Sequence, residues 1–397
     1  MDALKKRLIN LFALNVAFST SMQMIQTLFP LYLRSLNASE IEIGFVVALG
    51  GIAAMVTMIP SGLLIGKLGR KKMLITSVFL IALPPVFFIL LADWRQIVPF
   101  FMIFNVAMSF FAPSRMSLVA ESATQQNVAS LFGLMNLAWP LGGIISPVVS
   151  GYIVETMGWN HVFLVSVTIS ALSLIPAFMI DVEEASPPEN SEKEEKSSIL
   201  GSENRTTAIK FFSLNFLQTI GLGGVFVILP LYLKDLYDLP PSSIGLFFTI
   251  SNIIALITQI PSGYLADRFG KKRFMMGVIL PIPVLFMFWG QTDNWLVLLA
   301  LFSMAYSCWS MTWPSALALI SESFPPDMRG TAYSVMMTAE RLAFSIGPIA
   351  GGYMYSSMNP VYPFYVTSVS FMLSLIPAYL IKENPSQHIE DEVVPPR

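Results

Sequence analysis

The sequence is too apolar for a soluble protein. Of its 397 residues, 54% are hydrophobic and 12% are charged, whereas a soluble domain carries about 25% charged residues. A water-exposed globule is therefore excluded. The formal net charge of −2 gives no basic surface for nucleic acid, and Cys308 is the single cysteine, so an intrachain disulfide is excluded as well.

Apolar stretches recur along the chain, each long enough to cross about 30 Å of hydrocarbon as a helix. Because lipid offers no hydrogen-bond partners to the backbone, we expect helices and not strands. The basic N-terminus leads into the first stretch without a convincing cleavage site, so we interpret that stretch as a membrane helix. The twelve predicted spans are 8–33, 43–66, 73–92, 97–120, 128–153, 159–180, 208–233, 244–266, 274–291, 295–321, 330–356 and 361–381.

A charged segment divides these spans into two sets of six. Residues 181–206 hold eight acidic residues together with Lys193, Lys196 and Arg205. Low hydrophobicity and a run of charge predict a solvated linker, with a regulatory segment as the alternative. The predicted organisation is an N-terminal bundle at 1–180, a linker at 181–207, a C-terminal bundle at 208–382 and a tail at 383–397.

Basic residues predict the orientation. If the N-terminus is cytoplasmic, eighteen Lys and Arg residues fall on that side, and only Arg34, Arg95 and Lys234 fall on the other. The positive-inside rule then places both termini and the linker in the cytoplasm. We expect a multi-pass protein of the cell membrane.

The two halves repeat each other at a shift of 200 or 201 residues. Asn15 aligns with Asn215, Pro30-Leu-Tyr-Leu33 aligns with Pro230-Leu-Tyr-Leu233, and Glu121-Ser122 aligns with Glu322-Ser323. Since six helices separate equivalent positions, both halves start on the same side of the membrane. Such parallel repeats are typical of one large transporter class, whose substrate site lies between the halves.

One loop carries a specific motif, Gly263-x-x-x-Asp267-Arg268-x-Gly270-Lys271-Lys272, and its repeat copy contains Gly62, Gly69 and Arg70. With the repeat, this motif resembles the major facilitator superfamily over essentially the whole chain. The resemblance implies a fold of two pseudo-symmetric six-helix bundles, all α-helical, and a role for the loop in conformational change. We expect Asp267 to accept hydrogen bonds from an opposing helix N-terminus. In the repeat copy, Gly66 replaces that aspartate.

The fifth span also resembles a family pattern. Gly133, Gly142, Ser146-Pro147 and Ser150-Gly151 follow the spacing of a glycine motif found in drug-efflux antiporters of the superfamily. Two of its glycines are serine here, and close helix packing without an antiport role is the alternative. The resemblance favours export.

Charged residues inside membrane spans are costly and indicate function. Glu340 is the only carboxyl group predicted near the membrane midplane, and we interpret it as a candidate proton carrier, with a structural charge as the alternative. Its neighbour Arg341 is a candidate substrate contact. Four further charges are assigned structural roles, and the first of them is expected to pair with the second: Arg115, Glu121, Glu322 and Arg329.

Uncharged polar and aromatic side chains outline a predicted cavity, or else form contacts between helices. Asn15, Ser19, Gln23 and Gln26 fall on one stripe of the first helix. The remaining candidates lie on other helices: Asn105, Asn215, Gln218, Asn252, Tyr306 and Trp309. The Trp, Phe and Met residues around them suit an amphipathic or hydrophobic solute.

The sequence thus predicts a secondary transporter that works by alternating access, most simply a monomer that couples protons to the export of small hydrophobic or amphipathic molecules. An uptake symporter or facilitator is one alternative, and a transport-inactive receptor or scaffold is another. We find no P-loop and no catalytic or metal-ligand constellation, so we expect no enzyme activity, cofactor or metal.

Overall fold

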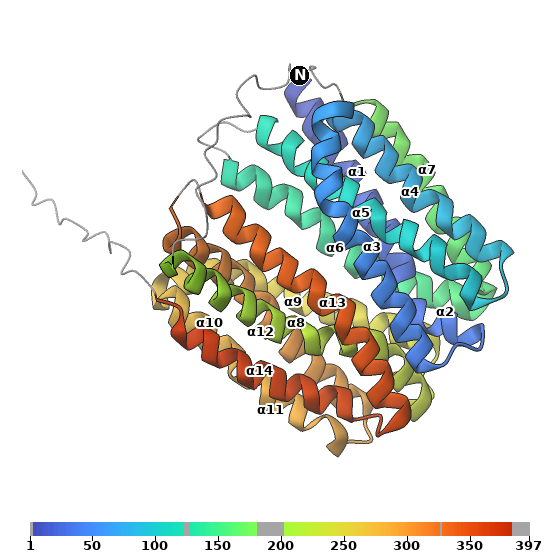
Figure 1. Ribbon diagram of the computed structural model, residues 1–397. Coiled ribbons are helices and arrows are strands. Elements are labelled where there is room, and N and C mark those ends of the chain that lie inside the picture. The colour runs from blue at the N-terminus through green and yellow to red at the C-terminus, as the bar shows by residue number, and fades with distance from the viewer. Residues whose placement is uncertain (1–2, 123–127, 181–201, 326–327, 383–397) are drawn as a thin grey trace, which may run out of the picture.

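A computed structural model describes residues 3–122, 128–180, 202–325 and 328–382. Two helical bundles lie side by side, α1–α7 in the N half and α8–α14 in the C half (Figure 1). Most of the predicted linker and the whole tail lie outside the described residues, so the domain boundaries stay predictions. The N-half helices are α1 Ala3–Gln26, α2 Phe29–Ser35, α3 Glu40–Leu68, α4 Arg70–Leu90, α5 Trp94–Ser122, α6 Val128–Met157 and α7 Trp159–Phe178. The C-half elements are α8 Ser202–Tyr237, α9 Pro241–Phe269, α10 Lys271–Ile279, α11 Pro281–Met287, the short 3₁₀ helix η1 Trp289–Gln291, α12 Trp295–Ser323, α13 Arg329–Ser357 and α14 Tyr362–Leu380.

Each of the twelve predicted spans is helical in the described residues, and two of them are broken. The first span is α1 followed by α2, which starts two residues after Thr27 and carries Pro30 in its first turn. The ninth span is α10 followed by α11, with Pro281 at the break. Proline lacks the N–H that would continue the ladder of helical hydrogen bonds, so it favours a break at both places, although Pro230, the counterpart of Pro30, lies inside the unbroken α8.

By length and composition, eleven helices in the described ranges are apolar enough to cross a membrane. The 29-residue α13 is long enough but is not among them. Its sequence is rich in Gly, Ser and Tyr, and it carries Glu340 and Arg341. Polar character in a helix of this length marks α13 as the helix to consider for function.

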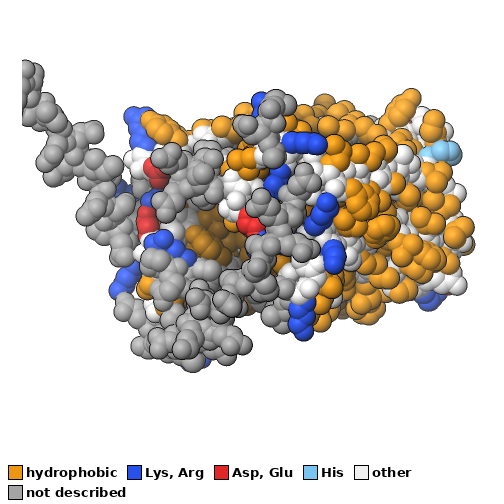
Figure 2. Space-filling view, turned by 90° about the horizontal axis from the view of Figure 1, so that it is seen from above, with side chains coloured by type: hydrophobic (Ala, Val, Ile, Leu, Met, Phe, Trp, Pro, Cys, Tyr) orange, Lys and Arg blue, Asp and Glu red, His pale blue; other side chains and the backbone are white. Residues whose placement is uncertain are grey.

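The two faces of the molecule differ in charge. The N-terminus, the α3–α4 turn at Gly69 and the α9–α10 turn at Gly270 lie at one end of the bundles, which we call the basic face; the other end is the distal face. Both turn glycines have positive φ, +82° and +88°, which a side chain would disfavour. Figure 2, a view onto this face, shows Lys and Arg side chains on both halves.

Equivalent helices pack in equivalent ways within the two halves. In the N half α1 packs against α6 and α7, and in the C half α8 packs against α13 and α14. The Asn15 side chain donates a hydrogen bond to the Met135 carbonyl (2.7 Å), and Asn215 donates to the Met336 carbonyl (2.8 Å). The internal repeat is therefore present in the structure at the level of single hydrogen bonds.

Candidate transport pathway

The halves meet along two helix pairs, α3 with α13 and α6 with α9. At both pairs a glycine lies directly against a carbonyl group of the other half. A Cβ atom added to Gly44 would fall closer than 3.0 Å to the Pro348 carbonyl oxygen. A Cβ atom added to Gly245 would likewise fall closer than 3.0 Å to the Pro147 carbonyl oxygen. The two contacts are related by the 201-residue repeat. We call these contacts, with those of Gly151 and Gly352 nearby, the distal seam. Side chains larger than hydrogen would hold the helices apart there.

The distal seam ends near the middle of the helices. On one side Thr249 donates a hydrogen bond to the Ile144 carbonyl (2.8 Å), and Asn252 donates to the Gly143 carbonyl (3.1 Å). On the other side Gly51 packs against Ser345. These hydrogen bonds and glycine contacts between the halves lie in the middle of the helices, and the distal seam continues from them to the distal face.

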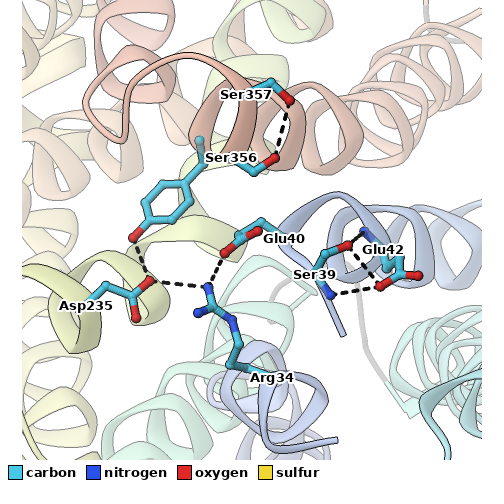
Figure 3. Close-up of polar contacts among 8 residues, drawn as sticks. Arg34, Ser39, Glu40, Glu42, Asp235, Ser356 and Ser357 are labelled. Atoms are coloured by element: carbon cyan, nitrogen blue, oxygen red, sulfur yellow. Dashed lines mark hydrogen bonds and ion pairs between the residues drawn. The ribbon is translucent and has the colours of Figure 1, made fainter. Parts of the chain in front are cut away.

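Charged side chains join the halves at the distal face. The Arg34 guanidinium lies 2.5 Å from Glu40 of its own half and 3.2 Å from Asp235 of the C half, and the Tyr355 hydroxyl donates to the same Asp235 carboxylate (2.9 Å). Figure 3 shows the guanidinium between the two carboxylates. We call these four residues the outer cluster. It holds the halves together where the distal seam begins.

On the basic face the halves separate. Figure 2 shows a hollow between them, with hydrophobic side chains on its floor and Lys and Arg side chains around it. With contacts at the distal face and a hollow at the basic face, the structure is open toward the basic face and closed at the distal face.

Glu340 and Arg341 lie just inside the distal seam, on different sides of α13. Arg341 continues the stripe of Ser345, Pro348 and Gly352, which faces α3 of the other half. Both charged side chains are half-buried. In the described structure, neither makes a hydrogen bond or ion pair through its side chain. Arg341 is thus placed at the boundary between the halves, with no hydrogen bond or ion pair from its guanidinium to another described residue.

The stripe that contains Glu340 faces α8 instead. On that stripe Met336 accepts the hydrogen bond from Asn215, and Gly347 and Gly351 lie against Ile220 and Gly224 of α8. At 1.5 Å per residue, Glu340 lies about 16 Å along α13 from Arg329. The carboxyl group is therefore inside the C half, at mid-depth.

Aromatic rings of the C half line the region beside these charges. Phe226 of α8 contacts Tyr306 (5.7 Å between ring centroids), Trp309 (6.5 Å) and Phe344 (6.4 Å). The Tyr306 hydroxyl donates to the Asn252 side-chain oxygen (3.4 Å). The Trp309 Nε1–H is buried without a hydrogen-bond partner among the described groups. Rings with free polar edges of this kind suit amphipathic ligands.

The polar stripe on α1 contacts α6 in this conformation. Ser19 and Gln23 both donate to the Trp139 carbonyl (2.9 Å each), one turn beyond the Asn15 contact. Gln26 is exposed. In the same way Asn105 donates to a carbonyl of its own helix, that of Phe101 (2.9 Å). These residues stay candidates for the cavity wall, but in this conformation Ser19, Gln23 and Asn105 bond to backbone carbonyls, and Gln23 also donates to the Ser19 hydroxyl (2.7 Å).

The loop motif and the structural charges form one ion cluster in each half. Glu121 pairs with Arg70 and with Arg7, the latter at 3.0 Å. The equivalent Glu322 pairs with Lys271. Because Gly69 and Gly270 turn the chain at the start of α4 and α10, the basic residue that follows each of them lies beside the end of α5 or α12.

The remaining motif residues lie at the surface of the basic face. Asp267 is 73% exposed and lies 3.9 Å from Lys271, without the predicted contact to an opposing helix. The Asp267 carboxylate lies at the surface of the face where the hollow separates the halves (Figure 2). Arg268 lies over its neighbour Phe269, Gly62 and Gly263 have open space around them, and Arg329 donates to the Phe324 carbonyl (3.2 Å).

The expected pairing of Arg115 with Glu121 is wrong. The Arg115 guanidinium donates to the Met135 carbonyl and to the Asn136 side chain, each at 3.3 Å. The two residues are six positions apart, and successive residues turn by about 100°, so they point to different sides of α5. Glu121 faces the basic residues of α1 and α4 instead.

Sequence reasoning missed the outer cluster. The charge pattern places Arg34 on the outer side and gives no reason to single out Asp235, Glu40 or Tyr355. One signal was available: Arg34 and Lys234 are equivalent in the repeat, and Asp235 directly follows Lys234. Equivalent ends of parallel repeats lie on the same side of the membrane, so a base from one half and an acid from the other could have been expected to meet.

Comparison with known proteins identifies the family. Residues 11–240 and 211–394 match the Major Facilitator Superfamily. The chain is 23% identical over 354 residues to Multidrug resistance protein 2 of Bacillus subtilis, covering 87% of this chain and 88% of that one. It is 25% identical over 285 residues to the cis,cis-muconate transport protein of Acinetobacter baylyi, with 67% of each covered. The crystal structure of a D-xylose-proton symporter superposes with a TM-score of 0.80 at 18% identity, over 96% of this chain and 98% of that one, which shows the shared fold. The chain is a multi-pass membrane transporter and belongs to the Major Facilitator Superfamily.

Proposed function

We propose that this transporter works by alternating access and couples the inward movement of protons to the export of small hydrophobic or amphipathic molecules. The observation that carries the proposal is the position of Glu340: a half-buried carboxyl group without an ion-pair partner in the described structure, at mid-depth, directly inside the contacts that close the distal face. A group placed there can exchange protons with one side in each conformation.

The geometry also supports alternating access. The distal seam and the outer cluster join the halves at the distal face, and the basic face carries the hollow. With the basic face in the cytoplasm, as the positive-inside rule predicts, the structure is the inward-open state. The outward-open state would require the distal seam and the outer cluster to separate.

The aromatic region around Phe226, Tyr306 and Trp309 supports the proposed substrate class, since apolar walls with a few polar edges bind amphipathic solutes. The similarity to a multidrug resistance protein fits export.

A specific observation favours a second substrate class. Arg341 faces the other half without a partner in the described structure, and guanidinium groups bind carboxylates in bidentate geometry. The name of the Acinetobacter relative gives an organic anion as its substrate. An exporter or uptake carrier of organic anions is therefore the second candidate.

A transport assay in proteoliposomes under an imposed pH gradient tests the proposal. We expect lipophilic dyes or organic anions to be driven against their concentration gradient, opposite to the proton gradient. In Glu340→Gln, driven accumulation should vanish while exchange of labelled for unlabelled substrate at equal pH continues. Asp93→Asn, which removes an exposed carboxylate of the distal face, is the control and should leave both activities unchanged.

Other outcomes select the alternatives. Transport in the direction of the protons indicates a symporter, and equilibration without accumulation indicates a facilitator. Ligand binding without any transport indicates a receptor. Full proton-driven transport by well-folded Glu340→Gln protein would reject the assignment of this residue.

A further inference from the structure

The C half contains a small cavity between α8, α10, α12 and α13, with three polar side chains in a mostly apolar wall. Its volume of about 10 Å³ is room for about one water molecule. Gln218 is 4% exposed, lines the cavity, and its Nε2–H₂ has no hydrogen-bond partner in the described protein. The cavity is lined by Phe211, Leu214, Asn215, Gln218, Met275, Thr312, Trp313, Ala316 and Met336.

The equivalent place in the N half is filled. Phe18 is the counterpart of Gln218 and Phe111 that of Thr312, and their rings stack with centroids 3.9 Å apart. Arg115 is the counterpart of Ala316, and its guanidinium reaches the Met135 carbonyl. The two halves otherwise share their packing here, down to the asparagine that binds the carbonyl of Met135 or Met336. The C half thus has an amide, a hydroxyl and a methyl group where the N half has two rings and a cation.

This difference points to a ligand. A buried amide N–H without a partner is costly, and polar cavities of this size normally hold water bonded to such groups. Asn215 and Thr312 offer further oxygen atoms on the wall of the same cavity. A water molecule there would accept a hydrogen bond from the Gln218 N–H and donate one to one of these oxygens.

The cavity also lies on the way to Glu340. Met336 closes it on α13, and Glu340 is one turn farther from the basic face on the same α8-facing stripe. The helices packed against α13 are α3, α8, α12 and α14. Arg341 is the charged group nearest Glu340 in the chain, and the packed helices carry their described charges only toward their ends, at Glu40, Glu42, Lys67, Arg205, Lys210, Lys234, Asp235 and Glu322. The other titratable side chains that the structure describes on these helices and on α13 itself are one thiol and nine phenols: Cys308, Tyr232, Tyr237, Tyr306, Tyr333, Tyr353, Tyr355, Tyr362, Tyr365 and Tyr379.

We propose that the cavity holds one ordered water molecule, and that this water and Gln218 form the proton path between the basic face and Glu340. The inference rests on the proposed role of Glu340 as the proton carrier. One proton reaches the water from the basic face, and the water passes one of its protons on toward the Glu340 carboxylate, which becomes the neutral acid. Gln218 orients the water and keeps its own hydrogens.

Infrared difference spectroscopy of the full-length protein after a pH jump tests the path. The Glu340 carboxyl band is identified as the band that Glu340→Gln lacks. We expect Gln218→Leu to slow the growth of this band by about tenfold or more, and Thr219→Val to leave its rate unchanged. Thr219 is the matched control because its hydroxyl is also buried and unpartnered, yet it is not among the cavity-lining residues. An unchanged rate in Gln218→Leu overturns the path but leaves the carrier role intact, whereas a Glu340 band that never titrates in the parent rejects the carrier role itself.

Radiolytic footprinting tests the water without any substitution. Hydroxyl radicals formed from an ordered water oxidise adjacent side chains, and Met336 lines the cavity although it is 2% exposed. Its N-half counterpart Met135 is 1% exposed and serves as the internal control. We expect Met336 to be oxidised several-fold faster than Met135, and the Gln218→Phe/Thr312→Phe protein, which copies the N half, to lose the difference. Equal oxidation of both methionines in the parent protein would show that the cavity is dry and overturn the proposal.

Discussion

The guanidinium of Arg34 lies 3.2 Å from the carboxylate of Asp235, and this ion pair connects the N half to the C half at the distal face. Both side chains are 34% exposed, so the pair contributes only about 0.2–1 kcal/mol. That is enough to shift a conformational equilibrium a few-fold and too little to prevent opening.

Arg34→Ala should move the population toward the state that is open at the distal face, by about two- to fivefold. Spin labels at Gln96 of the N half and Asp293 of the C half, both exposed at that face, report the separation by pulsed electron resonance. Arg95→Ala is the control, because Arg95 pairs only within the N half. The double variant Arg34→Asp/Asp235→Arg exchanges the two charges and should return the population toward that of the parent protein. If its population matches that of Arg34→Ala instead, the pair does not act between the halves.

Gly245→Ala should disfavour the same closed distal face more strongly. The new methyl group would collide with the Pro147 carbonyl, and overpacking of this kind costs about 1–3 kcal/mol. The same spin-label pair should show a larger distance. Gly277→Ala adds the same methyl group in open space on α10, outside the loop motif, and should change nothing; equal behaviour of the two variants would contradict a role for the close contact.

Asp267→Asn should slow conformational exchange and leave ligand affinity within a few-fold. The carboxylate is exposed in this structure, so the state that is open at the basic face loses nothing with it, whereas a state closed at the basic face would bring opposing helices near. Single-molecule fluorescence gives the exchange rate and equilibrium binding gives the affinity, with Asp293→Asn as the control. Lost affinity with an unchanged exchange rate would assign Asp267 to ligand binding instead.

Arg341→Lys should weaken the binding of anionic substrates by about tenfold and leave neutral ones unaffected, because lysine keeps the charge but lacks the planar fork of donors. Titration calorimetry with one anionic and one neutral ligand measures the contrast. Arg115→Lys changes a guanidinium that is bound to α6 and should show no such selectivity. A uniform loss for both ligands would indicate that Arg341 supports the structure.

Labelling tests the orientation. Single cysteines in a Cys308→Ser background, placed in 181–206 and in 155–160, should react differently with an impermeant thiol reagent applied to intact cells. We expect only 155–160 to react from outside. Reaction of both segments from outside would contradict the predicted orientation.

The architecture was predictable because it depends on properties that single residues carry. The length of the apolar stretches predicted the helices. A proline lies close to each of the breaks after Thr27 and at Leu280. The repeat predicted that Asn15 and Asn215 have equivalent surroundings. The ion pairs of Glu121 and Glu322 follow the same symmetry, although the partner expected for Glu121 was wrong.

The direction of polar side chains was not predictable in the same way. Ser19 and Gln23 lie on one stripe whether that stripe faces a cavity or another helix, and only the position of α6 shows which carbonyl they bind. Contacts between the halves also depend on the conformation. Asp267 is exposed in this state, and a single sequence holds no information about which state is populated.

If the protein works by the proposed alternating access, the outer cluster affects the energetics of each transport cycle. When the distal face opens, Arg34 keeps Glu40, which belongs to its own half, and Asp235 keeps the hydroxyl of Tyr355. The Tyr32 hydroxyl, bound to the Phe88 carbonyl, anchors α2 to α4 (2.7 Å), so Arg34 stays with the N half. When the halves separate, each charged group therefore keeps a hydrogen-bond or ion-pair partner in its own half, and neither group becomes an unpaired ion that only water can stabilise. Because each half keeps a partner for its own charge, breaking and re-forming this contact costs little free energy in each cycle. The rate of the proposed cycle would then depend on the slower rearrangement of the helices.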